Sequence, residues 1–369
     1  MSLMDKLLKA STVKMAAPLL DSKVFGKKEI VSTPVPMVNV ALSGSIDGGI
    51  QPGLTMLAGP SKHFKSAFAL LMAAAYQKKY DDAVILFYDS EFGTPQAYFQ
   101  AFGIDMARVM HTPITNIEEL KFDIVKQLDA IEKKDHVIIV IDSVGNLASK
   151  KEVDDANDGK SVADMTRAKQ LKSVFRIVTP HLNLKDIPMV VVNHIYMEQG
   201  LYPKAIVSGG TGIYLSADNI WIIGRQQEKD GTEIKGYHFV INIEKSRHVR
   251  EKSKIPITVT FDGGISKWSG LMDVAEEGGY LRKPKVGWYE AIDAETGEVL
   301  SDKLLRAKEI VDNAAFWKMM FDKTNFAEYI KDRYTVATKT LLSDEEHQIN
   351  TEEEDDDDEL EYRDAGSGV

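Results

Sequence analysis

Short runs of apolar, mostly β-branched residues alternate with longer stretches of helical periodicity through the first two thirds of the chain. Near-continuous apolar runs of this length are typical of strands that are buried on both faces of a sheet. Residues 66–80, 117–133 and 161–178 have the length and periodicity of helices between such strands. The pattern predicts an α/β fold, a mostly parallel central sheet flanked by helices and extended by two antiparallel strands. The predicted strands are residues 54–59, 83–89, 136–142, 187–193, 219–224, 237–246 and 255–264.

Other segments depart from this pattern and divide the chain into four predicted regions. Residues 3–20 are predicted to form a helix, and residues 31–36 (VSTPVP) an extended linker, because proline biases the preceding residue away from the helical conformation. After residue 268 the periodicity weakens, and the final Asp/Glu run has too little apolar surface to offset its ordering entropy. The predicted regions are an N-terminal helical arm (1–30), the core (31–268), a small α+β C-terminal domain (269–342) and a disordered acidic tail (343–369).

Composition and charge narrow the class of protein. The absence of cysteine excludes disulfides and thiolate metal sites. Charged residues interrupt the N-terminal segment, and no apolar run approaches the ~18 residues of a membrane span, so we expect a cytoplasmic protein with no membrane partner. The net charge is −11, but residues 344–364 hold 13 acidic residues and one arginine, which leaves +1 on residues 1–343. A near-neutral body with an acidic tail is compatible with binding a polyanion.

Residues 59–66 (GPSKHFKS) follow a predicted strand and precede an apolar helix, which is the context of a phosphate-binding loop. The backbone amides of such a loop face the phosphates of ATP, Lys65 neutralises their charge, and Ser66 is a ligand of Mg²⁺. Phe64 stands where the motif has glycine, so we expect either ordinary dihedral angles there or a loop that differs in detail. The predicted nucleotide-binding residues of the loop are Gly59, Pro60, Ser61, Lys62, His63, Phe64, Lys65, Ser66 and Ala67.

Polar residues end three of the other predicted strands. Asp142 ends one strand, where a carboxylate holds the metal ion, although a capping aspartate at a simple strand end is the alternative. Glu91 follows the strand that ends at Asp89, and is the candidate to orient and deprotonate the attacking water, whereas Asp89 is expected to be structural. His194 follows a third strand, as a sensor of the γ-phosphate or as an ordinary core histidine.

The order and spacing of GPSKHFKS, DSEFG, VIIVIDS and VVNH resemble those of the RecA/Rad51 family of strand-exchange recombinases over residues 30–268. The motifs PMVNVALSG, IDSVGNLASKKE, DMTRAK, GGTG and EKSR are similar to those of its members in T-even bacteriophages, as is the acidic tail. The resemblance implies a RecA-like P-loop ATPase core, Glu91 as the catalytic carboxylate and Tyr98 as the aromatic residue that stacks on adenine. It implies that His194 senses the γ-phosphate, at a position where RecA has glutamine.

The family's two DNA-binding loops correspond to residues 150–163 and 196–210, which we expect to be long and unpacked. The helix between them bears basic residues suited to phosphates, although a solvated helix face is the alternative. Lys245 and Arg247 match the cations that family members place on the nucleotide of the neighbouring protomer. The DNA-binding residues implied by the resemblance are Lys150, Lys151, Lys160, Arg167, Lys172, Arg176, Lys204, Gly209 and Gly210.

The resemblance implies an ATP- and Mg²⁺-dependent recombinase, a DNA-dependent ATPase that forms helical filaments on single-stranded DNA and pairs it with homologous duplex. It further implies a recombination mediator and a single-stranded DNA-binding protein as partners. The N-terminal arm then has a role in docking on the adjacent protomer, rather than folding back on its own domain. Three alternatives share parts of the sequence pattern: a ring-shaped helicase, a regulatory ATPase that exchanges no strands, and a small-molecule kinase.

Overall fold

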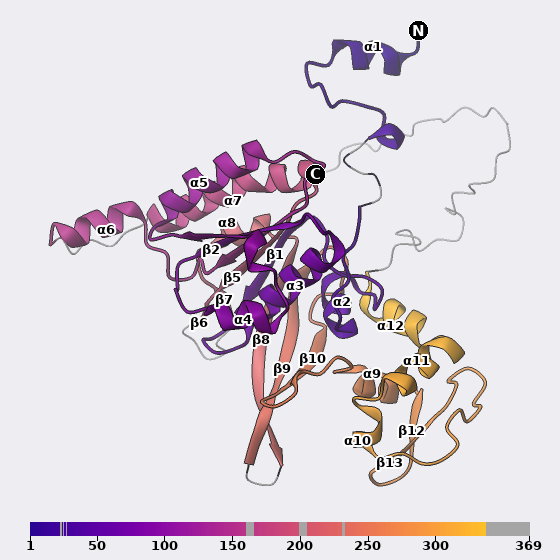
Figure 1. The fold of residues 1–369 in the computed structure, drawn as a ribbon. Coiled ribbons are helices and arrows are strands. Elements are labelled where there is room, and N and C mark those ends of the chain that lie inside the picture. The colour runs from indigo at the N-terminus through magenta and orange to yellow at the C-terminus, as the bar shows by residue number, and fades with distance from the viewer. Residues whose placement is uncertain are drawn as a thin grey trace, which may run out of the picture. The chain divides into compact units, whose positions relative to one another are not determined.

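A nine-stranded sheet forms the centre of the computed structural model, with strand order β11-β10-β9-β8-β1-β5-β4-β2-β3 (Figure 1). The structure describes residues 1–22, 24, 26, 28–159, 166–198, 205–230 and 233–336. The strands of this sheet are β1 (Gly53–Ala58), β2 (Val84–Asp89), β3 (Val109–Pro113), β4 (Val137–Asp142), β5 (Pro188–Asn193), β8 (Asn219–Asp230), β9 (Glu233–Ser246), β10 (Lys254–Thr260) and β11 (Gly264–Ile265).

The parallel strands all present their carboxyl ends at one edge of the sheet. Asp89 of β2 pairs with Asp142 of β4, and Ala58 of β1 pairs with Asn193 of β5. Strands β9, β10 and β11 continue the sheet in antiparallel pairings beyond β8. The prediction of a mostly parallel sheet with an antiparallel extension is therefore confirmed. Strand β3 was not predicted. It is the outermost strand on its side of the sheet and is largely exposed, so its sequence lacks a continuous apolar run.

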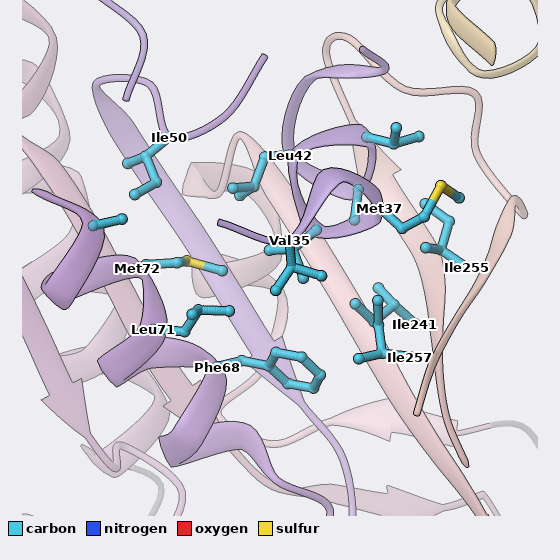
Figure 2. Packing of buried hydrophobic residues seen from close by; sticks show 14 of the residues in the cluster. Val35, Met37, Leu42, Ile50, Phe68, Leu71, Met72, Ile241, Ile255 and Ile257 are labelled. Atoms are coloured by element: carbon cyan, nitrogen blue, oxygen red, sulfur yellow. The ribbon is translucent and has the colours of Figure 1, made fainter. Parts of the chain in front are cut away.

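Helices cover both faces of the sheet, and each face has its own apolar cluster. Helix α3 (Lys65–Lys79) packs on one face, while α5 (Ile117–Ala130) and α7 (Thr166–Lys185) lie together on the other (Figure 1). Figure 2 shows Phe68, Leu71 and Met72 of α3 in the first cluster with Ile241 and Ile257 of the antiparallel strands. Burial on both faces explains why the central strands are continuous apolar runs.

The N-terminal region departs from its predicted elements. The helix predicted over residues 3–20 is the shorter α1 (Leu3–Ala10), which Ser11 caps, and a short 3₁₀ turn, η1 (Leu19–Asp21), follows it. Every residue of α1 is described and none of them is buried. The predicted linker leads at Pro36 into a buried helix, α2 (Pro36–Ser43), because proline at the first helical position has a suitable φ and needs no hydrogen-bond acceptor.

Residues 269–336 form short helices and a two-stranded sheet around Trp317 and Phe326, which are fully buried. These side chains belong to the same apolar cluster as Met37 of α2, and residues 1–336 form one compact unit. The boundary at residue 268 stays a prediction, and residues 337–369, with the predicted tail, lie outside the described residues. The elements are α9 (Leu271–Glu277), β12 (Leu281–Lys285), β13 (Trp288–Ala291), α10 (Ala307–Ile310), α11 (Ala314–Lys323) and α12 (Phe326–Tyr334).

Within the described ranges, no helix is both long enough and apolar enough to cross a bilayer.

Candidate nucleotide-binding site

The predicted phosphate-binding loop connects β1 to α3 and lies at the carboxyl ends of the parallel strands. Gly59 begins it, and a Cβ atom there would lie 2.9 Å from the carbonyl oxygen of Ile223, so the backbones approach too closely for a side chain. The Lys65 ammonium is buried and donates to the carbonyl of Pro60 at 2.7 Å. Burial lowers the pKa of Lys65, and the carboxylates of Glu91 and Asp142 oppose that shift. A phosphate could replace the Pro60 carbonyl as the partner of this ammonium.

Phe64, which stands where the motif has glycine, adopts the left-handed conformation, with φ 61° and ψ 16°. We expected ordinary dihedral angles or an altered loop, and the first alternative is wrong. The ring of Phe64 stacks on Phe239 with centroids 5.1 Å apart, and meets Phe68 edge-on at 5.5 Å. Such contacts offset the steric cost of a side chain in this conformation. The sequence could not reveal this, because Phe239 is remote in the chain.

Asp142 ends β4 beside the loop and is buried. The Thr94 hydroxyl donates to Oδ2 of its carboxylate at 3.3 Å. Its other oxygen, Oδ1, is buried and has no hydrogen-bond partner among the described residues. Burial raises the pKa of Asp142, and the Ser66 hydroxyl opposes that shift. A buried carboxylate oxygen beside a hydroxyl is a suitable donor set for a hard divalent cation, so these residues fit Mg²⁺.

Glu91 and His194, which are 103 positions apart in the chain, meet at the same edge of the sheet. His194 Nε2 lies 2.8 Å from Glu91 Oε1, and the Ser143 hydroxyl donates to that same oxygen. The bond from His194 is the largest cause that lowers the pKa of Glu91, and the Ser143 hydroxyl and Lys65 ammonium act in the same direction. Asp89 accepts from the backbone amides of Glu91 at 3.0 Å and Phe92 at 2.8 Å, which holds the turn that carries Glu91.

A cleft of about 470 Å³ connects the loop with Glu91, His194 and Tyr98. The Tyr98 side chain is half-exposed and lines this cleft. Five further residues, on β8, on β9 and in the segment from β10 to β11, line it as well, and none of them was among the predicted site residues. Aromatic residues in the last two apolar runs were the available signal for three of them. The five are Arg225, Tyr237, Phe239, Val259 and Phe261.

Lys245 and Arg247 lie away from the phosphate-binding loop of their own chain. Ser246 pairs with Asn219, and Asn219 pairs with Thr55, near the amino end of β1, whereas the loop follows the carboxyl end. Lys245 Nζ donates to the carbonyl of Tyr214 at 2.8 Å, and Arg247 Nε donates to an Asp218 carboxylate oxygen at 2.6 Å. Their own nucleotide site is therefore out of reach in this conformation.

The structure changes the prediction for the first DNA-binding loop. Residues Lys150–Asn157 form helix α6, capped by Ser149, whose side chain accepts from the Glu152 amide at 3.1 Å. The prediction of a loop is wrong there, because the capping serine and the acidic first turn favour a helix, whereas the expectation that the segment is unpacked agrees with α6, none of whose residues is buried. Lys150 and Lys151 on α6 are exposed. Residues 160–163 of this loop, including Lys160, lie outside the described residues.

The other predicted DNA-binding residues divide into exposed and engaged groups. Lys172 and Arg176 on α7 are exposed, whereas Arg167 is half-buried and bonded to backbone carbonyls. In the second predicted loop, residues Ile195–Met197 and Ala205–Val207 pair as strands β6 and β7, and Lys204 lies outside the described residues. Gly209 and Gly210 have φ values of 96° and 79°, and Gly210 caps α8 (Thr211–Ser216).

Comparisons with known proteins agree with this architecture. Residues 10–266 match the family described as RecA N-terminal domain, and residues 268–330 match the family described as Bacteriophage T4, Recombination and repair protein, C-terminal domain. The chain is 52% identical to the Recombination and repair protein of Enterobacteria phage T4, over 90% of this chain and 85% of that protein. It is 25% identical to Protein RecA of Trichormus variabilis, over 83% of this chain and 79% of that protein.

Proposed function

The chain belongs to the RecA family of recombinases, and from this premise we propose that it is an ATP-dependent DNA strand-exchange protein of recombination, repair and recombination-dependent replication. Protomers bearing ATP assemble as helical filaments on single-stranded DNA and pair it with homologous duplex. The observation that supports this most strongly is the joint position of Lys65, Glu91 and His194 on one cleft, with the Asp142 carboxylate close enough to oppose the pKa shift of Lys65. Base pairing supplies the sequence specificity, so the protein needs no contacts that read bases.

ATP hydrolysis requires a base, a phosphate clamp and a way to detect the γ-phosphate. Glu91 stays ionised because its pKa is lowered, and it faces the cleft, so it suits the role of orienting and deprotonating the attacking water. The buried Lys65 ammonium and the loop amides clamp the phosphates. His194 contacts Glu91 directly, so a γ-phosphate that attracts the imidazole would also release one partner of the base.

Ser66 and Asp142 would hold the Mg²⁺ ion, as the unsatisfied Oδ1 of Asp142 supports. When bound, the ion neutralises negative charge on the phosphate oxygens. Tyr98 at the cleft wall would stack on the adenine base.

Lys245 and Arg247 would complete the nucleotide site of the neighbouring protomer. Their position near the amino end of the parallel strands, away from their own loop, supports action between subunits. Cations supplied by a neighbour stabilise the charge of phosphoryl transfer, so hydrolysis then depends on assembly. Arm residues Leu3, Met4 and Leu7 are exposed, which supports docking of α1 on the adjacent protomer.

DNA would bind along Lys172 and Arg176 of α7 and the segments that flank this helix. The basic residues Lys150, Lys151, Lys160 and Lys204 would add phosphate contacts. We further propose a recombination mediator and a single-stranded DNA-binding protein as partners, and the cytoplasm of the cell, or of the infected host, as the place of action.

The first test measures ATP hydrolysis with and without single-stranded DNA and images the same mixture by electron microscopy. We expect stimulation by DNA and open helical filaments. Closed rings that unwind duplex DNA would instead identify a helicase. Hydrolysis that is indifferent to DNA would identify a small-molecule kinase or another nucleotide-dependent enzyme. DNA-stimulated hydrolysis without homologous pairing would identify a regulatory ATPase.

A further inference from the structure

Residues 143–147, which we call the strap, connect strand β4 to the segment before α6 and pass beside the cleft. The Ser143 hydroxyl at its start donates to Glu91 Oε1. Ser90 holds Ser143 on both sides, because the Ser143 amide donates to Ser90 Oγ at 3.1 Å and Ser90 Oγ donates to the Ser143 carbonyl at 2.6 Å. The Val144 amide donates to the carbonyl of Val192 in β5 at 3.1 Å. The position of the Ser143 hydroxyl, and with it one partner of Glu91, therefore depends on the path of the strap.

Arg167, at the start of α7, binds the backbone carbonyls of the strap. Its Nε donates to the Leu147 carbonyl at 2.8 Å, and its Nη2 donates to the carbonyls of Val144 at 3.0 Å and Gly145 at 2.6 Å. A guanidinium fork is the side chain that can hold several carbonyls of one turn in fixed directions. Within the described part of α7, Lys172 and Arg176 face solvent instead. In this conformation Arg167 therefore holds the strap, whereas Lys172 and Arg176 are exposed.

Gly145 brings the strap against the proposed sensor. A Cβ atom on Gly145 would lie 2.3 Å from His194 Cδ2 and 3.0 Å from the His194 amide nitrogen. The adjacent ring atom, Nε2, lies 2.8 Å from Glu91 Oε1. The strap, His194 and Glu91 therefore pack so closely that a shift of one requires a shift of the others.

We propose that Arg167 is a positioning residue for Glu91, acting through the strap, and that the strap links the DNA-facing helix to the site of hydrolysis. The path runs from Arg167 through the carbonyls of Val144 and Gly145 to the Ser143 hydroxyl and the His194 ring. Engagement of α7 by DNA shifts Arg167 and, with it, the two groups that hold Glu91. This inference rests on the proposed function and adds a physical route by which DNA controls hydrolysis.

The route gives Arg167 and Arg176 different roles although both are arginines on one helix. A residue that only binds phosphate loses DNA affinity when its charge is removed, and keeps most of that affinity when lysine replaces it. A residue that holds three carbonyls by its fork cannot be replaced by lysine without loss of that geometry. The pair Arg167→Lys and Arg176→Lys therefore separates positioning from simple phosphate contact.

The experiment combines Arg167→Lys with Ser143→Ala in a double-mutant cycle on kcat, at saturating ATP and single-stranded DNA. Misplacing a catalytic group by about 1 Å can cost about a hundredfold, so we expect Arg167→Lys to lower kcat by tenfold or more while DNA affinity changes less than threefold. Ser143→Ala should also lower kcat, and the double variant should lose little more than the worse single variant. Arg282→Lys, at an exposed arginine of β12 outside the proposed nucleotide and DNA sites, should leave kcat near wild type, alone and with Ser143→Ala.

A second readout needs no catalysis. In the nucleotide-free protein, Arg167→Lys should increase hydrogen–deuterium exchange at residues 143–149, whereas Arg176→Lys should not. Multiplicative effects of Arg167→Lys and Ser143→Ala on kcat, or unchanged exchange in the strap, would overturn the proposed link. A wild-type protein that does not hydrolyse ATP would refute the proposed function instead, and the exchange result would still judge whether Arg167 holds the strap.

Discussion

The conformation of Phe64 leads to an unusual prediction about stability. Alanine normally stabilises a chain relative to glycine, because glycine loses more backbone freedom on folding, by roughly 0.5–1 kcal/mol. At Phe64 the φ of 61° reverses the comparison, since a residue with a Cβ in the left-handed region costs roughly 1–2 kcal/mol that glycine avoids. We therefore expect Phe64→Gly to be more stable than Phe64→Ala by roughly 0.7 kcal/mol, the difference between these two contributions.

Both variants should be less stable than the wild type. Removing a fully buried phenylalanine costs about 3–5 kcal/mol. Phe64 is half-buried, so we expect a loss of roughly 2 kcal/mol from its contacts with Phe68 and Phe239 in the alanine variant. The expected order of stability is wild type, then Phe64→Gly, then Phe64→Ala. Urea unfolding followed by circular dichroism, without nucleotide or DNA, measures this order.

Lys78 provides a matched control on the same helix as the loop. It is exposed near the end of α3, where the backbone is helical, so Lys78→Gly should be about 1 kcal/mol less stable than Lys78→Ala. The two pairs of variants should thus give opposite signs in one assay. If Phe64→Ala is as stable as Phe64→Gly while the Lys78 pair behaves normally, Phe64 has ordinary dihedral angles and the reasoning is refuted.

Three further predictions concern the nucleotide site and the tail. Lys65→Ala should abolish nucleotide-dependent DNA binding, whereas Glu91→Gln should bind ATP, hydrolyse it slowly and lengthen filament lifetime; equal loss of binding by filter assay would contradict these separate roles. Mixing Lys245→Ala with Lys65→Ala protein should restore part of the ATPase rate that each lacks alone, and a mixture no more active than its components would count against a shared site. We expect the acidic tail to compete electrostatically with DNA for the basic surface, so truncation after Leu342 should tighten duplex binding and weaken its dependence on salt and Mg²⁺ in anisotropy titrations; an unchanged salt slope would exclude this competition.

The central strands were predictable because burial on both faces leaves a continuous apolar run in the sequence. Strand β3 was not, since its exposed edge position allows histidine and threonine among its residues. Helix α6 was missed because its residues were assigned to a loop from a resemblance, although Ser149 and the acidic first turn are local signals for a helix. The N-terminal helix ends early at Ala10, where the Ser11 hydroxyl accepts from the Val13 amide at 3.2 Å, a local bond that competes with helical hydrogen bonding.

In the candidate site, too, the positions of residues could be predicted from the sequence pattern, whereas their side-chain contacts could not. The positions of Asp142, Glu91 and His194 at strand ends could be predicted, because parallel strands bring their carboxyl ends to one edge. The bond between Glu91 and His194 could not, since it depends on side-chain directions. Arg167 was assigned to DNA from the resemblance to the family, and only the structure shows its guanidinium on the carbonyls of the strap.

A strand-exchange assay tests the central claim most directly. It combines the protein, ATP, Mg²⁺ and circular single-stranded DNA with either homologous or heterologous linear duplex, and follows the joint molecules on a gel. We predict joint molecules with the homologous duplex that require ATP, that are lost in Lys65→Ala, and that do not form with the heterologous duplex. ATP hydrolysis and DNA binding without any homology-dependent joint molecules would contradict the account.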